Sequence, residues 1–163
     1  MNTISLARAV LASTCLLSAG CGSDEPGPST GSPMVDPTLC DEEIRDEPFV
    51  DDMSKAGETV SVTLLDSQPA PPEMGDNVWE VRVTDLQGAP IDLVDPTTDL
   101  VIDQRMPGHP DHVMGGVTVT RLAAGEYRID PVSLPMHGYW EITLDILPPT
   151  GNPDSVMFKF CVD

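Results

Sequence analysis

Strict alternation between apolar and polar residues recurs along this chain and restricts its fold more than any other feature. From position 140 to 146, Trp, Ile, Leu and Ile occupy the even positions, and Glu, Thr and Asp occupy the odd ones. Successive side chains of a β-strand point to opposite faces, so a period of two gives a strand one apolar face. No stretch of the sequence has the sustained period of a helix. The pattern therefore predicts an all-β chain.

Other runs with the same alternation predict further strands. The clearest apolar faces are Val60, Val62 and Leu64; Trp79, Val81 and Val83; and Phe158, Phe160 and Val162. Weaker strands are expected around 100–105, 117–121 and 127–131. Turn-forming Gly, Pro and Asp residues separate the runs at fairly regular intervals. About seven short strands with one apolar face each predict an immunoglobulin-like antiparallel β-sandwich.

The N-terminus has the layout of a secretory signal. The cation Arg8 precedes an apolar stretch, residues 9–17, and small residues then lead to Cys21. The apolar stretch is too short to cross about 30 Å of hydrocarbon as a helix. A cleaved signal peptide over residues 1–20 is therefore favoured over a membrane span.

The residues before Cys21 also predict a lipid anchor. Leu17-Ser-Ala-Gly-Cys21 resembles a bacterial lipobox, in which the cysteine is acylated and becomes the new N-terminus, although Ser18 takes the place of the usual leucine. Ordinary signal-peptidase cleavage after Gly20 is the alternative. By resemblance to Gram-negative lipoproteins, Gly22 favours the outer membrane, with the folded domain in the periplasm or at the cell surface.

Composition separates a tether from a folded domain and excludes one class of partner. Residues 21–38 are rich in Gly, Pro, Ser and acids and lack apolar periodicity, which predicts a flexible tether. Residues 39–163 are then one domain. The formal charge of −19 argues against nucleic acid as a partner and against electrostatic docking on anionic lipid. The lipid on Cys21 would therefore provide the attachment to the membrane.

Two cysteines remain in the predicted domain, because Cys15 leaves with the signal and Cys21 is the lipid site. In an oxidising compartment, Cys40 and Cys161 are most simply a disulfide. Closing a loop of about 120 residues would destabilise the unfolded chain by about 4–5 kcal/mol in the chain-entropy view. A metal-thiolate pair is the alternative, but it lacks a CxxC spacing or a neighbouring histidine. The disulfide would hold the end of the tether against the outer face of the last strand.

Three motifs in order resemble one known family. They are a Met-Pro turn with nearby histidines in 105–114, Gly-x-Tyr at 125–127, and Gly-x-Trp-x-Ile at 138–142. Together they resemble the YtkA-like domain over roughly residues 57 to 147. The resemblance implies a small extracytoplasmic β-sandwich, and related exported sandwiches are associated with copper handling and respiratory-oxidase assembly. The histidine spacing is compressed around Pro110-Asp111, and the Cys40/Cys161 pair is an addition.

The histidines and their methionine neighbours are the candidate metal ligands. All three histidines lie in two short segments, with Met106, Met114 and Met136 beside them. Thioether sulfur suits Cu(I), whereas imidazole suits Cu(II) and Zn(II). Both segments are next to turns at strand ends, so in a sandwich they could meet at one pole. We hypothesise a surface copper site drawn from His109, His112, Met114, Met136 and His137.

A purely structural interpretation competes with the copper site. Met106-Pro107-Gly108 is favourable turn chemistry, and Met136 could fill core space under Trp140. The chain has neither a His-Cys-Met copper triad nor a long Met-rich tract. These residues would then serve the fold rather than bind a metal.

Other constellations are weaker. Asp92, Asp95 and Asp99 could line a calcium loop, but the EF-hand spacing is absent and a solvated turn is favoured. An enzyme is not expected, because the sequence lacks Gly-x-Ser-x-Gly, HExxH and a phosphate loop, and its outward carboxylates Glu141 and Asp145 lack a cleft. Two functional classes remain: an accessory protein that exchanges copper with an envelope partner, and a passive interaction module of the envelope.

Overall fold

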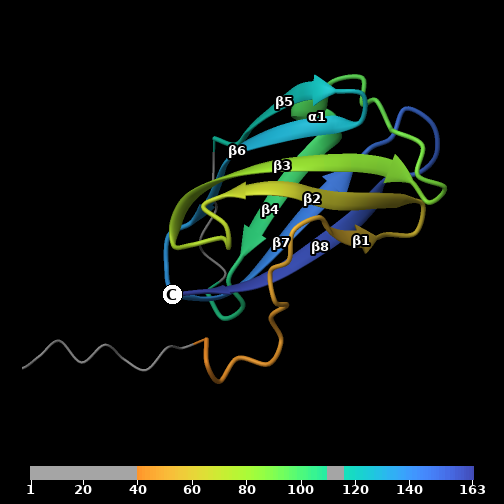
Figure 1. Cartoon of the computed structure of the whole chain (residues 1–163). Helices are drawn as coiled ribbons and strands as arrows, with labels where there is room; N and C mark the ends of the chain where they lie inside the picture. Colours follow the sequence, from red (N-terminus) through yellow and green to blue (C-terminus); the bar gives the residue numbers. More distant parts are fainter. Residues whose placement is uncertain (1–39, 110–115) are drawn as a thin grey trace, which may run out of the picture. The chain divides into compact units, whose positions relative to one another are not determined.

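A computed structural model of the chain describes residues 40–109 and 116–163. Eight strands and one short helix make up this part (Figure 1). In chain order they are β1 (Met53–Ala56), β2 (Val60–Gln68), β3 (Gly75–Asp85), α1 (Pro96–Asp99), β4 (Leu100–Arg105), β5 (Thr118–Ala123), β6 (Glu126–Leu134), β7 (Gly138–Ile146) and β8 (Asp154–Val162). No helix in these two ranges is long and apolar enough to cross a membrane.

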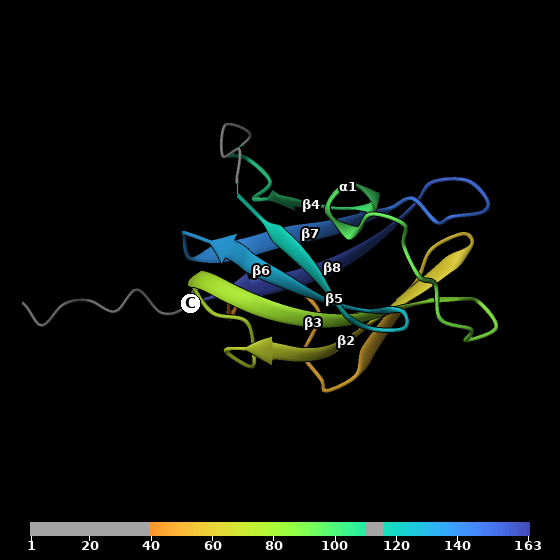
Figure 2. The ribbon, with the colours of Figure 1, turned by 90° about the horizontal axis from the view of Figure 1, so that it is seen from above.

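The strands form two antiparallel sheets. The larger sheet has the order β1-β2-β3-β6-β5, and the smaller one has the order β4-β7-β8. Figures 1 and 2 show the two sheets as separate layers whose strands cross at an angle. The predicted all-β antiparallel sandwich is therefore confirmed, with eight strands in place of about seven.

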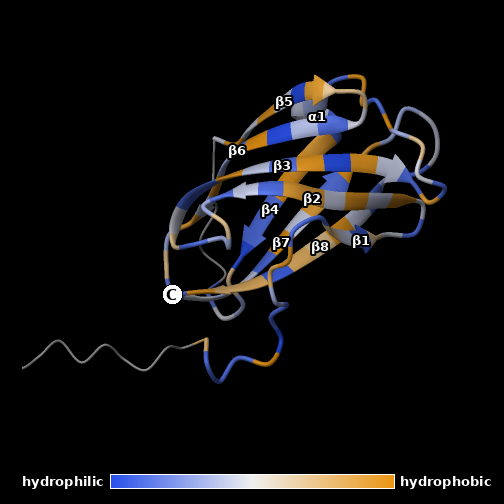
Figure 3. Cartoon of the chain, in the orientation of Figure 1, coloured by the Kyte–Doolittle hydropathy of each residue, from blue (hydrophilic) through white to orange (hydrophobic). Residues whose placement is uncertain are grey.

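The alternation in the sequence becomes the two faces of each sheet. Along β7, Trp140, Ile142 and Leu144 are buried, while Asp145 is exposed. The same banding of hydrophobic and hydrophilic residues runs along the strands in Figure 3. The two apolar faces pack against each other because burying them removes apolar surface from water.

Aromatic rings fill the centre of the sandwich. Trp79 in β3 lies edge-on to Phe158 and Phe160 in β8, at centroid distances of 5.7 and 5.8 Å. These contacts join the larger sheet to the smaller one in an edge-to-face geometry that aromatic pairs favour. Because Phe160 points inward, Cys161 is on the outer face of β8, where it forms the predicted disulfide with Cys40.

Candidate functional site

The register of the smaller sheet brings the two His/Met segments to one pole. Arg105, the last residue of β4, is opposite Glu141 in β7, so the turn after β4 is beside the start of β7. A Cβ built on Gly138 would be 3.2 Å from the Cε atom of Met106. The structure therefore places Met106, in the first segment, beside Gly138, which directly follows the second segment.

The turn after β4 presents His109 to solvent. The His109 N–H donates to the Met106 carbonyl over 2.9 Å, and Gly108 has a φ of 94°, which a residue with a Cβ rarely adopts. Met106 belongs to the hydrophobic core and is 8% exposed. The Met-Pro-Gly segment is thus a turn, and its methionine packs inward while its histidine is on the surface.

In the second segment, too, the methionine packs against the core and the histidine is exposed. Met136 is half-buried against the core, and its carbonyl accepts a 2.9 Å hydrogen bond from the Trp140 indole N–H. His137, the next residue, is exposed. The proposed core role of Met136 near Trp140 is supported, yet its side chain is still partly accessible beside an exposed imidazole.

Several predicted residues lie outside the described ranges. His112 and Met114 fall in 110–115, and the lipidation site Cys21 falls in 1–39, as do the predicted signal peptide and tether. Within 40–109 and 116–163, no three His, Cys, Asp or Glu side chains come together in a way that could hold a metal ion. Histidine and carboxylate donors of the described residues alone therefore do not form a metal centre.

The three aspartates that could line a calcium loop accept hydrogen bonds from backbone N–H groups. Asp95 is the N-cap of α1 and accepts from the Thr97 backbone N–H at 3.0 Å. Hydrogen bonds from the Thr97 side chain and backbone lower the pKa of Asp95. Asp99 accepts from the Asp95 N–H, and Asp92 accepts from the Gly125 N–H. These bonds support the interpretation of the segment as a capped turn.

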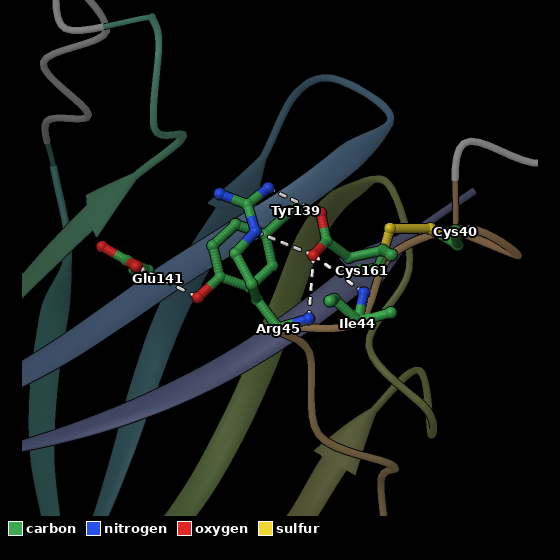
Figure 4. Close-up of polar contacts among 7 residues, drawn as sticks. Cys40, Ile44, Arg45, Tyr139, Glu141 and Cys161 are labelled. Atoms are coloured by element: carbon green, nitrogen blue, oxygen red, sulfur yellow. Dashed lines mark hydrogen bonds and ion pairs between the residues drawn. A yellow bond between two sulfur atoms is a disulfide. The ribbon is translucent and has the colours of Figure 1, made fainter.

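Sequence reasoning missed a polar cluster on the outer face of the smaller sheet. Arg45 is 4.1 Å from the centre of the Tyr139 ring, and the Tyr139 hydroxyl donates to Glu141 at 3.0 Å (Figure 4). Hydrogen bonding from Arg45 lowers the pKa of Glu43 to about 2, and burial together with the Glu141 hydrogen bond raises the pKa of Tyr139 to about 12. The alternation of β7 shows that Glu141 faces outward, but no local signal places Arg45 over Tyr139.

A shallow hollow of about 260 Å³ is on the same outer face. It is lined by Asp103, Arg105, Glu141, Thr143, Asp145 and Met157. Asp103 and Arg105 pair with each other at 2.6 Å, and the Ser155 hydroxyl donates to Asp145 at 2.5 Å. The outward carboxylates of β7 thus line an open hollow of mixed charge on the sheet surface.

These features define a small antiparallel β-sandwich with one disulfide and a pole that carries histidine and methionine. The family model described as YtkA-like matches residues 54–145, which is more than half of the chain. The protein belongs to the YtkA-like family. Comparison with curated proteins gives no match, and comparison with solved structures gives none either.

Proposed function

We propose that this protein is a non-enzymatic accessory protein of the bacterial envelope that binds copper at the pole between β4 and β7. It is exported, anchored by lipid on Cys21, and exchanges the metal with another envelope protein. The observation that supports the proposal is the packing of Met106, at the turn after β4, beside Gly138 at the start of β7, directly after the Met136-His137 segment.

The donor chemistry of this pole suits copper. The half-buried thioether of Met136 is a soft donor for Cu(I), and the exposed imidazoles of His109 and His137 are donors for Cu(II). The cysteine thiols of the domain do not compete, because Cys40 and Cys161 are joined to each other. His112 and Met114 remain the predicted additional donors from the intervening loop. Bound copper would supply a centre that changes between two oxidation states, and the chain would supply its ligands.

A titration with a matched control tests the proposal. The full chain is titrated with Cu(I) against a competing chelator and separately with Cu(II), and native mass spectrometry gives the stoichiometry. We expect one copper per chain, and Met136→Leu weakens Cu(I) binding by about tenfold or more because one soft ligand is lost. Met157→Leu, which alters a 39% exposed methionine in β8, leaves the affinity unchanged.

Histidine substitution provides the second arm of this titration. His109→Ala combined with His137→Ala should weaken Cu(II) binding by about tenfold or more, since imidazole is the donor that Cu(II) prefers. Equal affinity in the parent protein and in both sets of variants would contradict a site at this pole. Binding no tighter than to unrelated acidic proteins would remove copper from the proposal.

The hollow on the outer face favours a second candidate function, an interaction module without metal. Its lining carries both signs of charge, in Arg105 and in three carboxylates, and Met157 adds an exposed apolar group. Polar, solvent-accessible residues form the rim of protein–protein interfaces, so this hollow would lie at the rim of such a contact. A photocrosslinker at position 157 in cells should then capture one defined envelope protein, and capture of none would contradict this alternative.

A further inference from the structure

The segment before the first strand forms a strap along the edge of β8. We define the strap as residues 40–49; Cys40 is bonded to Cys161, and the Glu47 N–H donates to the Lys159 carbonyl at 2.9 Å. Figure 4 shows Cys40 bonded to Cys161 while Arg45 lies over Tyr139. β8 is the last strand in the order β4-β7-β8, so the strap occupies its otherwise unpaired side.

Side chains add a few contacts at the rim of the sandwich. The Arg45 guanidinium is over the Tyr139 ring, and Phe49 packs at 6.3 Å from Phe160 in a tilted arrangement. Arg45 also forms a 2.6 Å ion pair with Glu43, which lies in the strap as well. This ion pair orders the strap but does not attach it to the sheet.

Without the disulfide, little holds the strap in place. Among the described residues, one backbone hydrogen bond joins the strap to β8, and Pro48 lacks the N–H that would extend the ladder. Ile44 is 93% exposed, so it contributes almost no apolar burial. The 2.5 Å ion pair between Glu47 and Lys55 attaches the strap to β1 rather than to β8. The covalent bond is therefore the main attachment.

The sandwich does not depend on the strap for its core. The buried hydrophobic residues all lie between Met53 and Val162, and the strap adds only Phe49, which is partly buried. Both cysteines are half-buried, and Cys161 lies on the outer face of β8 rather than in the core. Removing the strap would uncover the Lys159 carbonyl at the outer edge of β8, which accepts the Glu47 N–H in the latched protein.

We propose that the Cys40–Cys161 disulfide is a redox latch on the strap. A dithiol reductant transfers two electrons and two protons, is itself oxidised to a disulfide, and leaves Cys40 and Cys161 as thiols. The strap then leaves β8 while the sandwich stays folded, and the Lys159 carbonyl at the edge of β8 is uncovered.

Hydrogen exchange on the full chain tests the latch. Amide exchange is measured by mass spectrometry in the oxidised protein, after reduction with dithiothreitol, and in the Cys40→Ser/Cys161→Ser double variant. We expect exchange in residues 41–50 to rise by about tenfold or more in both unlatched forms, because a strap no longer tethered to β8 at Cys40 opens more often. β3 and β6 also exchange faster, because the unfolded chain is no longer constrained by the loop, but they stay much more protected than residues 41–50. Alkylation at Cys40 and Cys161 confirms reduction.

Two results would overturn the latch. Unchanged protection of residues 41–50 in the double variant would show that non-covalent contacts suffice to hold the strap. Exchange in β3 and β6 as fast as in an unfolded chain, in both unlatched forms, would show that the sandwich does not stay folded without the disulfide. Reoxidation of the reduced wild-type chain is the control, and it should restore the original protection of the strap.

Discussion

Asp154, at the start of β8, accepts hydrogen bonds from several backbone N–H groups. Its carboxylate accepts from the N–H groups of residues 58–60, at 2.7 to 3.1 Å, and from the N–H of Ser155 at 2.8 Å. A Cβ on Gly57 would be 2.6 Å from the carboxylate, so only glycine leaves room for it. One buried side chain thus ties the turn between β1 and β2 to the last strand.

These bonds also set how the carboxyl titrates. Burial by itself raises the pKa of Asp154, but the backbone hydrogen bonds from Thr59, Val60, Glu58 and Ser155 outweigh it and lower the pKa from 3.8 to about 2. Because the folded-state pKa is below the unfolded value, the ionised carboxylate stabilises the fold fully above pH 3.8. This stabilisation is lost as the pH falls from 3.8 toward about 2.

Asp154→Asn should therefore destabilise the domain in a pH-dependent way. We expect the free energy of unfolding at neutral pH to fall by about 1.5–3 kcal/mol, because charge-assisted bonds to buried N–H groups are lost. Urea denaturation measures the difference, which should shrink as the pH falls below 3.8. The control Asp76→Asn alters an exposed carboxylate of β3 and should change little. A difference that does not depend on pH would contradict the role of the charge.

At the scale of elements, the central and edge strands of the larger sheet differ in what they bury. β6 pairs with both β3 and β5, and its Ile129 is fully buried opposite Trp79 on one side and Val119 on the other. β5 is an edge strand in which Val119 is buried and Leu122 is 48% exposed. The central strand therefore contributes more to stability than its edge neighbour.

Alanine substitutions in the two strands should show this difference. Ile129→Ala removes packed atoms from between the sheets and leaves a cavity, so it should cost about 2–5 kcal/mol of unfolding free energy. Leu122→Ala removes exposed atoms and should cost less than about 1 kcal/mol. Both values come from the midpoints of urea denaturation with an unchanged m-value. Equal costs would contradict the assignment of β6 to the centre of the core.

For the whole molecule, the charge of −19 determines how it can be held at a membrane. An anionic lipid surface repels a protein with this charge, so electrostatic attraction does not provide an anchor. Under the proposed function, the acyl chains on Cys21 supply the attachment through burial of their methylene groups in the bilayer. Attachment of this kind is insensitive to salt, because it does not depend on ion pairs.

Cell fractionation tests this anchor. In cells, the wild-type protein should stay with the membrane fraction through a wash in 1 M salt, an ionic strength at which the Debye length is about 3 Å. Cys21→Ser should move it to the soluble fraction, and mass spectrometry should find acyl groups on the N-terminal peptide of the wild type. Cys15→Ser is the matched control, since this residue is predicted to leave with the signal. Cleavage after Gly20 without acylation would contradict the lipid anchor.

Local patterns predicted most strands but not all of them. The apolar faces at Val60, Trp79, Trp140 and Phe158 were recognisable because each lies in a run that alternates over several residues. β1 was not predicted, because its four residues bury only Met53 and are too few to establish a period. The weak run around 127–131 belongs to a longer strand, Glu126–Leu134, whose pattern is interrupted at Asp130-Pro131.

The candidate site was predictable in its residue types but not in its environment. Histidine and methionine residues gather in two turn segments, and these residue types suggested the candidate site. Both segments lie within the region that matches the YtkA-like family. Burial of Met106 and exposure of His109 follow from how the turn after β4 packs against Gly138, which is a long-range contact. Sequence patterns alone do not determine such a contact.

Sequence patterns predicted the all-β class, the inward and outward faces of the strands, the turns and the pairing of Cys40 with Cys161. Each of these features follows from local periodicity, from turn chemistry or from a count of residues. The tertiary structure was needed to show that β6 is beside β3, that Met106 packs beside Gly138, and that the Glu47 N–H bonds to the Lys159 carbonyl. The physical reason is that a period of two specifies which face of a strand is buried, whereas the packing of distant segments selects its neighbours.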